Sequence, residues 1–160
     1  MKYKIKTTTK QSTYGAASIF NAIVDELDID EALVDDDVDT IESYLEGEII
    51  ENGDDVTVSY AEIIDNDGSL ADTTITFKKS NPKEIFLTRH GAVTSVMQFT
   101  QGGRTICVYN TPFMPFEICV FTKLIDNKLL ECGYLEITYL IEIKGACAQK
   151  TIFRMDVQGL

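Results

Sequence analysis

Apolar and polar residues alternate along most of this chain. Near the start, Tyr3, Ile5 and Thr7 alternate with lysines, and the same pattern recurs at residues 56–60 and 73–77. A period of two places alternate side chains on the same face, as in a half-buried β-strand. The pattern therefore predicts strands over most of the sequence.

Nine further strands are expected after the first. They are predicted at 39–51, 55–64, 70–79, 83–90, 93–100, 103–111, 114–125, 129–144 and 146–157. Most links are short, such as Asn52-Gly53-Asp54 and Gln101-Gly102-Gly103, which permits sequential antiparallel pairing and leaves no room for crossover helices. Rolling up removes the two long edges of such a sheet, so we expect an all-β, closed antiparallel meander barrel of about 8–10 strands. A β-sandwich is the alternative.

One stretch has a different period. Between Ala16 and Leu27 the apolar residues recur at steps of three and four, which is typical of a short amphipathic helix. The surrounding residues 11–77 contain 19 acidic residues and no Lys or Arg. We therefore expect an acidic helical insert over 14–38, either as a lid on the barrel or as solvated surface.

Length and charge narrow the functional classes. A chain of 160 residues fits one domain, 1–160. Its formal charge of -12 opposes binding to a phosphate backbone, so nucleic acid is not an expected partner. Neither a secretory signal nor an apolar run long enough for a membrane span is evident. The sequence thus favours a cytoplasmic protein.

Cysteine and acidic spacings do not predict a metal site or a cofactor. Cys107, Cys119, Cys132 and Cys147 form no CxxC pair, so we expect reduced, mostly packed thiols. The segment 65–68 resembles the middle of an EF-hand calcium loop. However, Ile63 occupies the position of the first ligand and Thr74 that of the closing Glu. It is better explained as a hairpin turn.

Several segments resemble the YwiB-like family of uncharacterised bacterial proteins. The most specific are Arg89-x-Gly91-Ala92-Val93 and Tyr109-x-Thr111-Pro112-Phe113, with further similarity at 97–99, 102–106, 117–118, 122–123 and 133–139. The resemblance runs from about Asp39 to Val157 and implies a calycin-type barrel similar to lipocalins and fatty-acid-binding proteins. It implies no activity, because the family has none established. Met114 and the stretch 14–38 depart from the family pattern.

A barrel of this size holds one small ligand if side chains do not fill it. Arg89 alternates with apolar Ile85 and Leu87, and Arg104 precedes Ile106 and Val108 in the same way. If these faces point inward, Arg89 and Arg104, with Tyr109 or Tyr139, bind a carboxylate or phosphate head group. If they point outward, each Arg is a surface cation.

Catalysis has little support in the sequence. His90 is the only histidine, and no spacing supplies it with a nucleophile or an orienting partner. No catalytic residue is therefore predicted.

An aromatic cluster supplies a different hypothesis. Phe113, Met114, Phe116 and Phe121 surround a proline-rich turn, where they either plug one barrel end or form an interaction rim. We therefore expect a non-enzymatic binding module for a small amphipathic or anionic ligand. The alternative is an interaction barrel with a filled core that contacts partners, or a second copy as a homodimer, through this rim or the acidic insert.

Overall fold

The computed structural model describes residues 2–13, 38–63, 70–91, 94–110, 115–143 and 146–159. These residues form ten strands and, among them, one short helix. The elements are β1 (Lys2–Thr13), β2 (Val38–Asn52), β3 (Asp55–Ile63), β4 (Leu70–Lys78), β5 (Asn81–His90), β6 (Ser95–Thr100), β7 (Arg104–Asn110), β8 (Pro115–Lys128), α2 (Leu129–Cys132), β9 (Tyr134–Ile143) and β10 (Ala146–Gln158).

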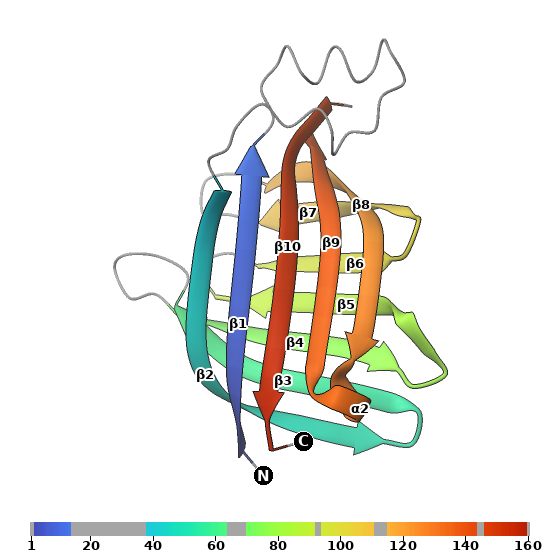
Figure 1. Cartoon of the computed structure of the whole chain (residues 1–160). Helices are drawn as coiled ribbons and strands as arrows, with labels where there is room; N and C mark the ends of the chain where they lie inside the picture. Colours follow the sequence, from blue (N-terminus) through green and yellow to red (C-terminus); the bar gives the residue numbers. More distant parts are fainter. Residues whose placement is uncertain are drawn as a thin grey trace.

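The strands form one antiparallel sheet in the order β6-β5-β4-β3-β2-β1-β10-β9-β8-β7. Every neighbour except the β1–β10 pair is consecutive in sequence, which is the predicted meander. In Figure 1, β1, β2, β8, β9 and β10 run lengthwise in front, and β3 to β7 cross behind them. The predicted all-β barrel with ten antiparallel strands is therefore confirmed in its main features.

Closure differs in part from the prediction. The strands β6 and β7 lie next to each other, yet no ladder of backbone hydrogen bonds joins them, so the barrel is nearly closed rather than closed. A side chain bridges this seam instead: the Thr105 hydroxyl donates to the backbone oxygen of Gln98 over 2.6 Å. We call this β6–β7 boundary the seam.

The apolar core fills much of the barrel. Alternate residues of each strand point inward, as in β4, where Ala71, Ile75 and Phe77 are buried between more exposed neighbours. Burial of such apolar side chains is the main favourable term in folding. The largest fully buried side chains come from strands around the barrel and, in the case of Leu129, from α2: Phe99, Ile5, Ile75, Ile85, Met97, Ile125, Leu129, Leu135, Ile137, Leu140, Met155 and Val56.

The connection after β8 differs from the link at 126–128 between the predicted strands 114–125 and 129–144. The strand β8 continues through these residues to Lys128, and α2 makes the turn before β9 begins at Tyr134. Gly133 ends the helix with a φ of 77° while its amide donates to the Leu129 oxygen. Glycine is favoured here because left-handed backbone costs it little.

Two predicted features lie outside the described residues. The helical insert at 14–38 falls there except for Val38, which begins β2, and so does the expected hairpin turn at 65–68. Neither is tested by the described structure.

Candidate functional site

A small cavity lies inside the barrel, above the packed core. Its volume is about 150 Å³, and its walls come from β1, β5, β6, β9 and β10. The lining residues are Thr9, Gln11, Leu87, Arg89, Met97, Phe99, Tyr139, Ile141, Gln149 and Phe153. Side chains therefore fill part of the barrel interior and leave this part open.

Arg89 reaches this cavity because of the alternation in β5. Ile85 and Leu87 are buried on the inner face, and Arg89 is the next residue of that face. Of the two orientations that the sequence left open, Arg89 therefore has the inward one. Its side chain is 30% exposed, so it is partly removed from solvent.

An acidic partner holds the guanidinium. Arg89 Nε donates to Glu62 Oε1 over 2.7 Å, and Thr73 Oγ1 donates to the same carboxylate oxygen over 2.7 Å. Burial is the largest single influence on the pKa of Arg89 and lowers it, but the charge and hydrogen bond of Glu62, with smaller contributions from Tyr60 and Tyr139, together outweigh burial. The pKa of Arg89 is therefore raised, and the group carries its charge inside the barrel.

Two tyrosines lie near Arg89. The ring of Tyr139 lies 4.8 Å from that of Phe99, tilted by 51°, and both rings line the cavity. Tyr60 is 5% exposed. Burial, with a smaller contribution from Glu62, raises the pKa of Tyr60 above its ordinary value of 10, so its hydroxyl stays protonated at neutral pH.

Arg104 is not part of this cavity. It lies on the outer face with Ile106, which is 67% exposed, and its own side chain is 59% exposed. The guanidinium carbon stands 4.5 Å from the centre of the Phe121 ring, and Nε lies 3.4 Å from Glu142 Oε1. The structure thus separates the two arginines and places Phe121 beneath Arg104.

The remaining predicted residues divide into three groups. Tyr139 joins Arg89 in the cavity wall. His90 is exposed at the end of β5. The side chains of Tyr109, Phe113, Met114 and Phe116 lie outside the described part of the structure.

Sequence reasoning missed Glu62, the partner that fixes Arg89. The alternation of Val56, Val58 and Tyr60 was recognised, and the same parity continues to Glu62. An acid that follows an inward apolar stripe is a signal for a buried pair, because a charge enters a core only with a partner.

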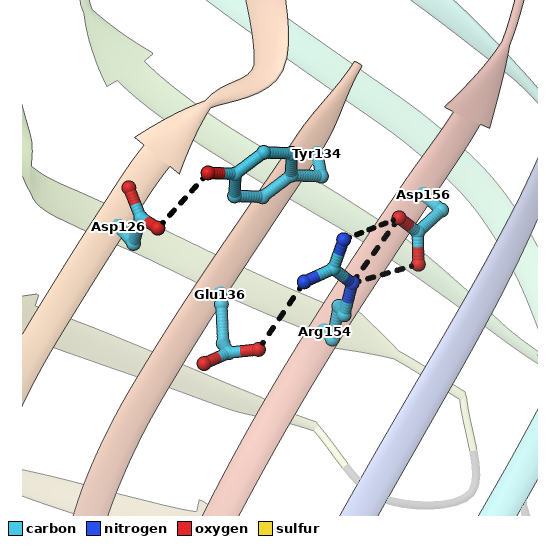
Figure 2. A network of polar contacts seen from close by, with 5 residues as sticks. All are labelled: Asp126, Tyr134, Glu136, Arg154 and Asp156. Atoms are coloured by element: carbon cyan, nitrogen blue, oxygen red, sulfur yellow. Dashed lines mark hydrogen bonds and ion pairs between the residues drawn. The ribbon is translucent and has the colours of Figure 1, made fainter. Parts of the chain in front are cut away.

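The outer face of β8, β9 and β10 carries a polar network that sequence reasoning also missed (Figure 2). Arg154 bonds both carboxylate oxygens of Asp156 and lies 3.5 Å from a Glu136 oxygen, while the Tyr134 hydroxyl donates to Asp126 over 3.1 Å. The hydrogen bond with Asp156 is the largest cause of the raised pKa of Arg154. Because these charges are already paired on an exposed face, we interpret the network as surface structure.

A larger hollow, about 470 Å³, lies along β1, β2 and the end of β10. Lys4, Lys6, Glu46 and Asp156 supply charges of both signs to its wall. It is the bigger space, but the cavity beside Arg89 combines enclosure with an oriented charge, and it is therefore the stronger candidate site.

No second class of site emerges from the described residues. They contain no group of three or more His, Cys, Asp and Glu side chains placed to hold a metal ion. Of the helical structure described, none has the length and apolar character needed to cross a membrane.

Comparisons with known proteins point to one family. A family model described as a domain of unknown function, DUF1934, matches residues 29–155. Among solved structures, the chain is similar to the ywiB protein from Bacillus subtilis, with a TM-score of 0.66 and 20% identity over 97% of this chain and 92% of that one. No curated protein matches the chain. At this identity the structural likeness shows a common fold.

Proposed function

The chain belongs to the DUF1934 family, and we propose that it is a lipocalin-like, non-enzymatic binding protein for a small anionic or amphipathic ligand. The observation that carries this proposal is the placement of Arg89, held by Glu62, in the wall of a cavity inside the barrel. A binding site of this kind needs few polar groups, provided that their orientation is fixed.

Arg89 suits the head group of an anion. A guanidinium has five N–H donors in a rigid fork, and the bond from Nε to Glu62 fixes its plane without using the Nη groups. Those groups have the geometry to bind a carboxylate or phosphate through two parallel hydrogen bonds. Since Glu62 offsets much of the charge of Arg89, we expect geometry rather than net charge to determine which anion binds.

The cavity limits the size of the ligand. Its volume of about 150 Å³ is close to that of a cavity that accommodates benzene. Leu87, Phe99 and Phe153 supply apolar parts of its wall. A short acid with a compact body fits this space, whereas a long-chain fatty acid does not.

The surroundings of Cys107 and His90 favour binding over catalysis. Cys107 is 1% exposed, and burial raises the pKa of its thiol despite a hydrogen bond from the Val96 backbone. A buried neutral thiol is a poor nucleophile. His90 is exposed, and no bond to an orienting carboxylate is found for it among the described residues.

Native mass spectrometry of protein purified from its own cells tests this proposal. We expect a bound small acid that is lost in Arg89→Met combined with Glu62→Gln, a pair of changes that avoids leaving a buried charge unpaired. Arg104→Met is the matched control, because Arg104 lies outside the barrel. A ligand-free wild type, or equal retention in both variants, would contradict the proposal.

An interaction barrel is the second candidate, and one observation favours it. Val96, Ile106 and Val108 are 52%, 67% and 45% exposed, and all three lie on the strands that flank the seam. Exposed apolar side chains on strand edges are typical of contact surfaces. If this candidate is correct, sedimentation will show a dimer or larger assembly that Ile106→Asp dissociates.

A further inference from the structure

Two glutamines line the cavity beside Arg89, and they are neighbours in the sheet. Gln11 lies on the inner face of β1 with the buried Ile5, and Gln149 lies on the inner face of β10 with the buried Thr151. Gln11 and Thr151 are partners in the ladder between these strands, so Gln11 and Gln149 are diagonal neighbours. Long side chains at such positions are within reach of each other. One part of the cavity wall therefore carries two adjacent primary amides.

Neither amide is bonded to a neighbouring side chain. Among the residues that the structure describes, none forms a hydrogen bond with the side chain of Gln11 or Gln149. Each amide therefore offers a carbonyl acceptor and two N–H donors to another molecule. Because both residues are half-buried, a ligand that pairs with these groups gains affinity over one that does not.

The glutamines and Arg89 belong to opposite walls of the cavity. The strands β1, β9 and β10 run lengthwise on one side of the barrel, and β5 and β6 cross behind them (Figure 1). Arg89 comes from β5, whereas Gln11 and Gln149 come from the facing wall. A ligand inside the cavity therefore meets a guanidinium on one side and two amides on the other.

Aromatic rings supply much of the remaining wall. Phe99, Tyr139 and Phe153 line the cavity, and the ring centres of Phe99 and Tyr139 are 4.8 Å apart. Such side chains pack well against the face or edge of another aromatic ring. The volume of about 150 Å³ has room for one six-membered ring. Wall and volume thus both favour a ligand with a flat, single-ring body.

From this arrangement we infer that the ligand is a planar ring carboxylic acid with a lactam edge, which is an N–H beside a C=O in the ring. The carboxylate binds the guanidinium of Arg89, and the lactam edge binds the amides of Gln11 and Gln149. A glutamine amide matches a neighbouring donor and acceptor through two parallel hydrogen bonds, as it does with adenine. A carboxylate is smaller than a phosphate, so it leaves room for the ring in this cavity.

This inference rests on the proposed function and is more specific than it. Titration calorimetry with benzoate, nicotinate and 6-hydroxynicotinate in its lactam form tests it. The three acids share a six-membered ring and a carboxylate, but benzoate has no polar ring atom, nicotinate has an acceptor, and the lactam has a donor and an acceptor. We expect the lactam to bind at least about tenfold more tightly than benzoate, as two additional hydrogen bonds would provide. Nicotinate should lie between them.

Two variants test whether the amides cause the preference. Gln11→Met and Gln149→Met keep an unbranched side chain and break no hydrogen bond to a described residue, so both are expected to fold. In each of them the tenfold ratio should fall to about threefold or less, while the affinity for benzoate stays unchanged. Gln98→Met is the matched control, because Gln98 lies between the buried Met97 and Phe99 and faces away from the interior.

Each outcome supports or overturns a stated part of the inference. Equal binding of benzoate and the lactam, or the same fall of the ratio in Gln98→Met, would overturn the lactam edge and leave the binding function standing. Cyclohexanecarboxylate should bind more weakly than benzoate, and tighter binding would overturn the planar ring. If none of these acids binds, the inference is wrong. The proposed function is then wrong as well if the protein from cells carries no small molecule.

Discussion

Arg89 and Glu62 are joined across an intervening strand, with Nε and Oε1 2.7 Å apart inside the barrel. Arg89 belongs to β5 and Glu62 to β3, and Thr73 of β4 donates to the same carboxylate oxygen. Three strands therefore meet at one carboxylate. This arrangement leads to a stability prediction as well as the functional one.

Removal of Glu62 is expected to destabilise the fold. Glu62→Ala leaves a partly buried guanidinium without its partner, and breaking a buried pair costs about 3–5 kcal/mol. Because the Arg89 side chain is 30% exposed, solvent screening reduces the expected loss below that range, to about 2 kcal/mol. Urea denaturation measures the change in unfolding free energy.

Glu42→Ala is the matched control for this measurement. Glu42 pairs with Lys6 at 3.6 Å on the exposed outer face, and such pairs contribute about 0–1 kcal/mol. Equal losses in Glu42→Ala and Glu62→Ala would show that the inner pair has no special role.

Tyr60 is expected to control stability at alkaline pH. Its pKa in the folded protein is raised, chiefly by burial, above the ordinary value of 10. Above pH 10 the unfolded chain therefore binds fewer protons than the folded one, so stability falls as pH rises, by up to about 1.4 kcal/mol per pH unit for one group. Unfolding free energies measured between pH 9 and 12 should fall less steeply in Tyr60→Phe.

The same variant tests the unpartnered hydroxyl at neutral pH. Since the Tyr60 hydroxyl has no partner among the described residues, Tyr60→Phe should keep or increase the stability of the ligand-free protein. A loss of more than about 1 kcal/mol at pH 7 would indicate a hydrogen bond at that hydroxyl.

Gly47 is expected to be intolerant of any side chain. An added Cβ would lie 2.5 Å from Ile5 Cδ1 and 2.7 Å from the Ser59 backbone oxygen, so Gly47→Ala forces the Ile5 side chain to move and the backbones of β2 and β3 to separate. Overpacking of this kind costs about 1–3 kcal/mol. Thermal unfolding should show the loss.

Gly53 offers a comparison for Gly47. Nothing lies within 4 Å of an added Cβ there, but the φ of 63° disfavours other residues. Gly53→Ala should therefore lose only the backbone contribution, about 1 kcal/mol. Reversed magnitudes would contradict the packing argument.

Thiol reactivity should follow burial. Cys132 is exposed in α2, whereas Cys107 is buried and has a raised pKa. Because the thiolate is the reactive form, iodoacetamide at neutral pH should alkylate Cys132 at least about tenfold faster than Cys107. Peptide mass spectrometry over time measures the two rates, and faster labelling of Cys107 would show that the barrel opens readily.

The alternation of residues predicted most of the fold, because a period of two directly determines which side chains share a face. It correctly grouped Arg89 with Ile85 and Leu87. It could not decide which face of a strand is internal. In β7 the apolar residues Ile106 and Val108 point outward and Cys107 points inward, which reverses the usual relation between hydrophobicity and burial.

Local irregularities were also beyond sequence reasoning. The register shift between Thr122 and Leu124 changes the inward parity of β8 without a Gly or Pro at that point. The continuation of β8 through Asn127 depends on long-range contacts, since the Asn127 side chain donates to the Pro82 backbone oxygen. Neither effect is encoded in neighbouring residues alone.

The seam is the boundary at which we expect the barrel to open. Where β1 and β10 pair along ten registered positions, separation must break a continuous ladder. Between β6 and β7, bonds that involve the side chains of Thr105 and Cys107 take its place. Among the strand boundaries, opening will therefore begin at the seam, near Val96 and Ile106, and the amide protons of β6 and β7 that face it will exchange with deuterium before those between β1 and β10. The barrel is therefore a rolled sheet whose two edge strands, β6 and β7, are held together mainly by side chains.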